Sequence, residues 1–157
     1  MKPASELILW RHADAEPGLA DSRRALTDKG RKQAARVARW LAPRLEGEWV
    51  VLSSPAVRTR QTAEALGRPF EVLEALSTST SPDALLEATG WPATGRRVIV
   101  VGHQPTLGEV AARLLTGEPG DLTVKKGALW WFSCRDHGTA GFGETVLRAV
   151  IAPDLAD

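Results

Sequence analysis

The chain has 157 residues, of which 43% are hydrophobic and 25% charged, and its formal net charge is +1. This length predicts a single domain, residues 1–157, with a sizeable core. The balanced charge provides no general attraction to nucleic acid or to membranes, and no apolar run reaches the roughly 18 residues that a membrane-spanning helix needs. Because Cys134 is the only cysteine and the amino terminus has no long apolar stretch, we expect a cytoplasmic protein without internal disulfides.

Apolar runs and helical spacings predict ten elements along the chain. In order, we expect a strand at 7–10, a helix from 28 to about 42, a strand at 50–52, a helix from 55 to about 66, a short strand at 70–73, a short helix from 82 to about 90, a strand at 98–101, a helix from 106 to about 116, and strands at 129–133 and 145–151. Thr27 and Ser54 are the expected N-caps of the first two helices, with Pro55 as the first helical residue after Ser54.

The alternation of strands and helices predicts an α/β fold with three α/β/α layers. In such a fold a mainly parallel sheet carries helices on both faces. The last two strands are joined by a glycine-rich loop at 135–143 and could be antiparallel.

Distinctive polar residues follow three of the predicted strands. Arg11 and His12 come after the first strand, Ser54 after the second with Arg58 one turn later, and His103 after the strand at 98–101. Parallel strands bring their carboxyl ends to one edge of the sheet, where open α/β folds bind ligands. Two arginines, two histidines and the amino ends of two helices would therefore surround one small volume, which favours an anion such as phosphate.

The histidines do not have the spacing of a metal site. His12 and His103 lack neighbouring cysteine or carboxylate ligands, and His137, in the glycine-rich loop, receives no role, so we expect no metal. The chain also lacks a Walker loop and a G-x-S-x-G nucleophile motif. A neutral imidazole is itself a good nucleophile, and it can attack phosphorus to form a phosphohistidine that water later hydrolyses.

These residues resemble the signatures of the histidine phosphatase superfamily, which has the phosphoglycerate-mutase-like fold. Arg11-His12-Ala13 is similar to its RHG motif, with alanine in place of glycine. Residues 54–63, SPAVRTRQTA, resemble the SPxxRxxQTA segment, and 102–105, GHQP, resemble the segment of the second histidine. The short chain and residues 24–30, RALTDKG, resemble the SixA-type subgroup of phosphohistidine phosphatases.

The resemblance implies a role for each matching residue. His12 would be the nucleophile, and Arg11, Arg24, Arg58 and His103 would hold the phosphoryl group without any cofactor. The adjacent Arg23 could take the place of Arg24.

Larger members of the superfamily also carry a carboxylate general acid, and Glu74 lies in roughly that region without the surrounding pattern. An alkoxide leaving group needs a proton in the transition state, whereas the imidazole of a phosphohistidine is a better leaving group. The absence of an evident acid therefore favours phosphohistidine on a signalling protein, which the resemblance suggests could be a histidine-phosphotransfer domain.

Two alternatives stay open at this point. One is a small-molecule phosphomonoesterase that uses Glu74 as its acid, and the other is a non-catalytic phosphate-binding module. Neither nucleic acid nor a membrane is expected as a partner, and the oligomeric state is left open.

Overall fold

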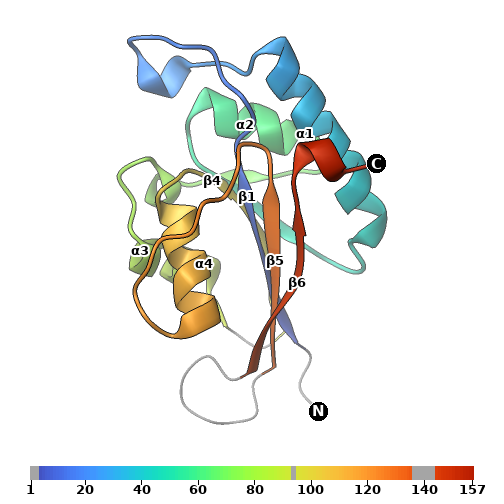
Figure 1. The fold of residues 1–157 in the computed structure, drawn as a ribbon, viewed down its shortest axis with the longest axis vertical. Coiled ribbons are helices and arrows are strands. Elements are labelled where there is room, and N and C mark those ends of the chain that lie inside the picture. The colour runs from blue at the N-terminus through green and yellow to red at the C-terminus, as the bar shows by residue number, and fades with distance from the viewer. Residues whose placement is uncertain (1–3, 93–94, 136–143) are drawn as a thin grey trace.

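A six-stranded mixed sheet forms the centre of the computed structural model, which describes residues 4–92, 95–135 and 144–157 (Figure 1). The strands are β1 (Ser5–Arg11), β2 (Val50–Ser53), β3 (Glu71–Val72), β4 (Arg97–Gly102), β5 (Leu129–Arg135) and β6 (Glu144–Ile151). Their order is β3-β2-β4-β1-β5-β6. The first four strands are parallel, β5 is antiparallel to β1, and β6 is antiparallel to β5. The prediction of a mainly parallel sheet is confirmed, and the last two strands are antiparallel to each other, as the sequence allowed.

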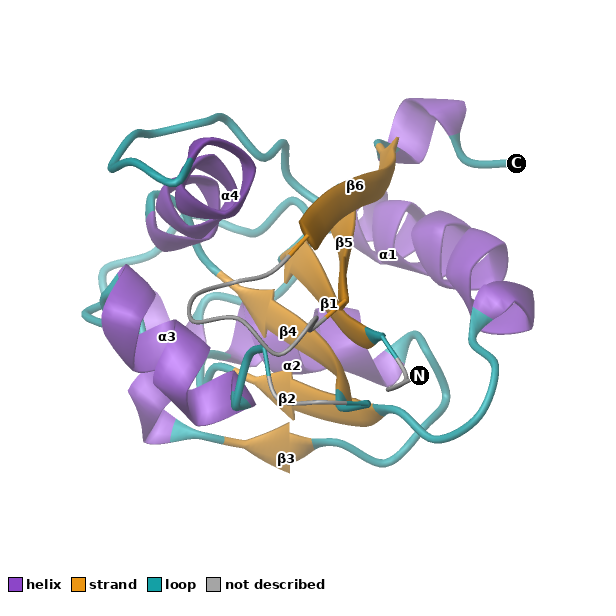
Figure 2. Ribbon diagram, turned by 90° about the horizontal axis from the view of Figure 1, so that it is seen from below, coloured by secondary structure: helices purple, strands orange, loops and turns teal. Residues whose placement is uncertain are grey.

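Helices cover both faces of this sheet (Figure 2). The helices and short 3-10 turns are η1 (Asp21–Arg23), α1 (Asp28–Leu41), η2 (Ala42–Arg44), α2 (Val57–Glu64), η3 (Glu74–Leu76), α3 (Pro82–Thr89), α4 (Thr106–Thr116) and η4 (Pro153–Leu155). Residues of α1 and α2 belong to one large hydrophobic cluster, and residues of α3 and α4 belong to another. The three-layer α/β/α fold class is therefore confirmed. No helix within the described ranges is both long and apolar enough to cross a membrane.

The apolar run of β1 is explained by burial on both faces. Leu7 and Leu9 pack in the cluster of α3 and α4, while Ile8 and Trp10 pack in the cluster of α1 and α2. All four side chains are completely buried. Because successive side chains of a strand point to opposite faces, a strand between two helical layers has no polar alternation. This double packing holds the carboxyl end of β1 in place, where Arg11 and His12 follow.

Capping residues close in the sequence mark the start of α1, both ends of α3 and the end of α4. The Thr27 hydroxyl accepts a hydrogen bond from the Gly30 amide at the start of α1, as predicted. The Ser81 hydroxyl does the same for the Ala84 amide at the start of α3. Gly90 and Gly117 adopt left-handed conformations at the ends of α3 and α4, which glycine does without strain.

The predicted start of the second helix was wrong. α2 begins at Val57 with Ala56 as its N-cap, rather than at Pro55 after a Ser54 cap. The Ser54 hydroxyl instead accepts from the Ala56 amide at 3.3 Å and lies 2.8 Å from Nε2 of His103. The Ser54 hydroxyl therefore bonds to His103, which follows β4, and does not cap the helix.

The loop after β1 is tied to the first turn of α1. The Thr27 amide donates to the Asp14 carbonyl at 3.0 Å, and the Thr27 hydroxyl donates to the Asp14 carboxylate at 2.8 Å. A Cβ atom on Gly30 would lie 2.0 Å from the Asp14 carbonyl oxygen, so only glycine permits this approach. These contacts fix the backbone immediately after His12.

Candidate active site

The three polar strand ends meet at one edge of the sheet. β2, β4 and β1 are neighbours, with Arg11 opposite Gly102 and Ser53 opposite Val101. The next residues along each chain segment, His12, Ser54 and His103, therefore lie together. The ring centroids of His12 and His103 are 5.5 Å apart. The structure thus brings together residues that are about 90 positions apart in the sequence.

His12 is buried and held from two sides. Its amide donates to the Gly102 carbonyl at 3.2 Å, and its Nδ1 lies 2.8 Å from the Ala13 carbonyl oxygen. A carbonyl can only accept, so Nδ1 carries the proton and Nε2 carries the lone pair. Burial, followed by the charges of Arg58, Arg11 and Arg24, lowers the pKa of His12 to about 4, against the opposing effect of the Ala13 hydrogen bond. His12 is therefore a neutral imidazole near pH 7.

His103 is also buried, and it contacts both Ser54 and Arg58. Its Nε2 lies 2.8 Å from the Ser54 hydroxyl, and its Nδ1 lies 3.4 Å from a terminal nitrogen of Arg58. Burial, followed by the charge of Arg58, lowers the pKa of His103 to about 3. A guanidinium can only donate, so Nδ1 of His103 is the acceptor in the contact with Arg58, and Nε2 carries the proton that it donates to the Ser54 hydroxyl.

Arg58 and Arg11 place two guanidinium groups beside the histidines. Arg58 is only 4% exposed, and Arg11 donates through one terminal nitrogen to the Val124 carbonyl at 2.9 Å. Within the described residues, the buried Nε atoms of Arg58 and Arg11 have no hydrogen-bond partner. Buried donors are costly to leave unpaired, and the oxygens of a bound anion would satisfy both.

Arg24, and not its neighbour Arg23, joins this group of charges. One terminal nitrogen of Arg24 lies 3.1 Å from the Asp21 carboxylate, whose other oxygen lies 3.1 Å from Arg58. Arg23 is exposed, and among the described residues no ion pair involving it is found. The arrangement favours Arg24 over Arg23, the choice that the sequence left open.

Asp21 is a residue of this site that the sequence analysis missed. Its carboxylate contacts Arg58 and Arg24, and its backbone carbonyl accepts from Arg58 at 2.8 Å. Hydrogen bonds from Arg24 and then Arg58 lower the pKa of Asp21. Its only sequence signal is a carboxylate three residues before a candidate phosphate ligand, in an exposed segment without helical or strand periodicity.

Glu74 lies outside this group of contacts. It is exposed at the start of η3, and in the described part of the chain no hydrogen bond or ion pair joins it to His12, His103 or Arg58. Its predicted role as general acid stays a prediction. His137 lies outside the described residues.

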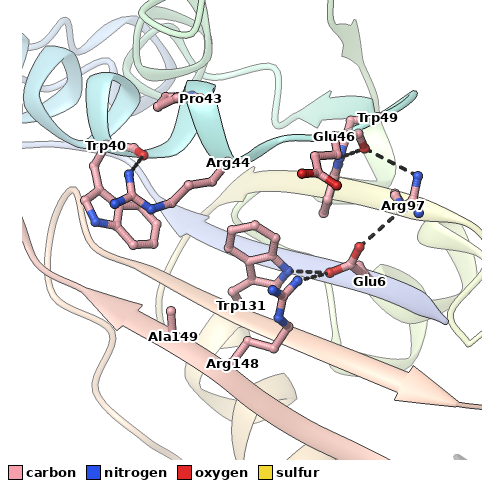
Figure 3. A pocket seen from close by; sticks show the side chains of 10 residues that line it. All are labelled: Glu6, Trp40, Pro43, Arg44, Glu46, Trp49, Arg97, Trp131, Arg148 and Ala149. Atoms are coloured by element: carbon pink, nitrogen blue, oxygen red, sulfur yellow. Dashed lines mark hydrogen bonds and ion pairs between the residues drawn. The ribbon is translucent and has the colours of Figure 1, made fainter.

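A separate pocket of about 510 Å³ lies at the opposite end of the parallel strands (Figure 3). Glu6 and Arg97, near the starts of β1 and β4, help to line it together with three tryptophans. The Glu6 carboxylate accepts from Trp131 Nε1 at 2.9 Å and from Arg148 at 2.6 Å, and it pairs with Arg97 at 3.2 Å. These polar groups largely satisfy one another, and neither catalytic histidine candidate lines the pocket.

Comparisons with known proteins find relatives in sequence and in structure. Residues 7–80 match the family model of the histidine phosphatase superfamily (branch 1). An uncharacterized protein of Picosynechococcus sp. is 36% identical over 138 residues, which cover 79% of this chain and 82% of that protein. The phosphohistidine phosphatase SixA of Escherichia coli K12 is 30% identical over 128 residues, covering 72% of this chain and 76% of that protein. A solved structure of the protein histidine phosphatase SixA with tungstate has a TM-score of 0.75 and 26% identity, over 95% of this chain and 97% of that chain.

Proposed function

This chain belongs to the histidine phosphatase superfamily, and from that premise we propose that it is a metal-independent phosphohistidine phosphatase with His12 as the nucleophile. One observation carries the proposal. The hydrogen bond from Nδ1 of His12 to Ala13 leaves the Nε2 lone pair available, beside His103, the buried guanidinium of Arg58 and the half-buried guanidinium of Arg11. A neutral imidazole surrounded by cationic donors is suited to attack a phosphoryl group.

The reaction proceeds in two displacements. Nε2 of His12 attacks phosphorus as the bond from phosphorus to the substrate nitrogen breaks, and the substrate imidazole leaves with that electron pair and takes up a proton. Water then attacks the phosphohistidine at His12, releasing inorganic phosphate and restoring the neutral imidazole. Because phosphoryl transfer depends mainly on positioning and charge neutralisation, the arginines can supply the charge that a metal supplies in other enzymes.

Arg11, Arg58, Arg24 and His103 are the proposed ligands of the phosphoryl oxygens. The unpaired Nε donors of Arg11 and Arg58 are available for two of these contacts. In these contacts Nδ1 of His103 accepts from Arg58 and Nε2 donates to the Ser54 hydroxyl, so a neutral His103 can donate to a phosphoryl oxygen only if it gives up one of them when phosphate binds. Such donors stabilise the negative charge that spreads over the phosphoryl oxygens in the transition state.

A phosphorylated protein is the proposed substrate, with a histidine-phosphotransfer domain as the type that the SixA relative suggests. The segment before η1 supports this, because residues 16–20 are exposed beside the site and leave it accessible to a protein surface. We also propose a cytoplasmic location, since a chain with one cysteine can form no internal disulfide.

A substrate comparison tests the proposed function. Turnover is measured on a phosphohistidine-bearing phosphotransfer domain, on a small phosphoramidate and on a sugar phosphate. We expect kcat/KM for the N–P substrates to exceed that for the sugar phosphate by about 100-fold or more, the typical contribution of a general acid. Preference for the sugar phosphate would favour a phosphomonoesterase. Tight phosphate binding without turnover or a phosphoenzyme would favour a binding module.

Replacing Glu74 with glutamine should leave kcat/KM on all three substrates within about twofold of the wild-type value, since a surface change that breaks no contact of the site has little effect. The physical reason is that Glu74 is exposed and makes no contact with the histidines or with Arg58 in the described residues. Steady-state kinetics check this, with Glu71→Gln on the adjacent β3 as the matched exposed control. A loss of about 100-fold on the sugar phosphate alone would show that Glu74 is a general acid.

Activity should persist in moderately acidic solution. His12 must be neutral to attack, and its pKa is lowered to about 4, so kcat/KM should stay level from pH 7 to pH 5 and fall as pH drops through about 4. An enzyme whose nucleophilic histidine had the ordinary pKa of about 6.5 would lose activity at a higher pH, as the solution is acidified through about 6.5. A pH–rate profile with a small phosphoramidate, corrected for the substrate's own ionisation, checks the prediction. A half-maximal point near pH 6.5 that belongs to the enzyme would contradict it.

A further inference from the structure

We infer that Asp21 is a positioning residue, which holds Arg58 and Arg24 in the orientation that phosphoryl binding requires. This inference rests on the proposed function, since it concerns the same site. Asp21 belongs to η1, a turn without buried residues, yet both oxygens of its carboxylate and its backbone carbonyl are engaged by arginines of the site.

The contacts with Arg58 explain how one end of its guanidinium is held. One terminal nitrogen donates to the Asp21 carbonyl at 2.8 Å, and the other donates to the Asp21 carboxylate at 3.1 Å. The second of these nitrogens also lies 3.4 Å from Nδ1 of His103, while Nε has no partner in the described residues. Asp21 and His103 therefore engage both terminal nitrogens of Arg58, and Nε is left as the donor for an anion next to His103. The planar guanidinium, held by these contacts, fixes the direction in which Nε donates to that anion.

The contact with Arg24 extends the same arrangement to a second cation. One terminal nitrogen of Arg24 meets the other carboxylate oxygen of Asp21 at 3.1 Å, and its Nε donates to the Glu16 carbonyl at 2.7 Å. Two guanidinium groups that converge on one volume repel each other before an anion arrives. A carboxylate shared between them offsets this repulsion and keeps both close to the histidines.

Because Asp21 is exposed, its effect on the orientation of the arginines can be measured apart from any effect on folding stability. Its side chain is 56% exposed and that of Arg24 is 28% exposed, so water screens their attraction and the pair adds little to folding. Arg58 is 4% exposed and makes its other contacts within the site. Loss of the carboxylate should therefore change the orientation of the arginines without unfolding the protein.

Asp21→Asn and Asp21→Ala test the inference through anion binding. Calorimetric titration with inorganic phosphate and with tungstate measures the Kd of each protein, independently of any turnover. We expect both variants to bind either anion about tenfold more weakly, with a further loss in kcat that brings kcat/KM to about 100-fold below wild type, the scale of a misplaced catalytic group. Their Tm should fall by no more than about 3 °C.

Asp83→Asn is the matched control. Asp83 is also exposed and pairs with an arginine of the same exposure, Arg113, but this pair joins α3 to α4 away from the histidines. The control should leave anion binding, kcat and KM unchanged. Anion binding that is unchanged in the Asp21 variants would overturn the inference, and tighter binding would show that the carboxylate competes with phosphate.

The failure of this inference can be distinguished from the failure of the proposed function. If wild-type protein forms no phosphoenzyme at His12 but the Asp21 variants still lose phosphate binding, the proposed function fails and the positioning role stands. If wild type turns over phosphohistidine and the Asp21 variants bind and react like wild type, the positioning role fails alone.

Discussion

His12→Ala should lower the rate of phosphohistidine hydrolysis by at least about a thousandfold, because the variant lacks the atom that accepts the phosphoryl group. Nothing at the site replaces it directly. His103 is 5.5 Å away between ring centroids, and its Nε2 is engaged with Ser54. The remaining arginines should still bind phosphate, so Kd for inorganic phosphate should change far less than kcat.

Two measurements check this result. Steady-state turnover gives the loss of rate, and reactions with a radiolabelled substrate, stopped in alkaline detergent where phosphohistidine is stable, show whether a phosphoryl group is trapped on the protein. Wild type should give a labelled phosphohistidine at residue 12, and the alanine variant should give none. His137→Ala, at a histidine to which the sequence assigns no role, is the matched control and should retain full turnover. Wild-type turnover in His12→Ala would contradict the nucleophile assignment.

Arg58→Lys should lower kcat/KM by about 100- to 1000-fold, the scale seen when one donor to a transition-state oxyanion is removed. The reason is geometric, because lysine keeps the charge but not the planar fork. The Arg58 guanidinium contacts the Asp21 carbonyl, the Asp21 carboxylate and His103 at once, which one ammonium group at the end of a flexible chain cannot reproduce. Both kcat and the affinity for phosphate should fall.

Arg60→Lys provides the comparison on the same helix. Arg60 is exposed two residues further along α2, so this variant carries the same chemical change outside the site. Steady-state kinetics and phosphate titration of both variants, with Tm as a check on folding, measure the difference. Equal activities for the two variants would show that Arg58 does not bind the phosphoryl group.

Much of the fold was predictable because its signals are local. The apolar runs at 7–10 in β1 and 98–101 in β4 predict buried strands, and the Thr27 and Ser81 caps act within three residues of their own positions. The convergence of Arg11, His12 and His103 was also predictable, since parallel strands share the edge at which they end.

Ser54 is the position at which the local rule for helix capping gave a wrong prediction. Serine followed by proline is a good beginning for a helix, yet α2 begins at Val57. The hydroxyl bonds instead to His103, which lies 49 residues away in the sequence. A capping rule considers only the residue's own segment and cannot account for a competing partner that the sheet brings close.

The amino-acid sequence by itself determined the strand and helix pattern, the sheet edge at which the polar residues gather, and the identity of the histidine and arginine candidates. Only the tertiary structure decided that Arg24 rather than Arg23 pairs with Asp21, that Ser54 hydrogen-bonds to His103, and that Asp21 links two arginines. The physical reason is the distance along the chain over which each kind of interaction acts. Helix and strand preferences arise from neighbouring residues, whereas the direction of a guanidinium or hydroxyl is set by charges and hydrogen-bond partners that only folding brings within about 3 Å.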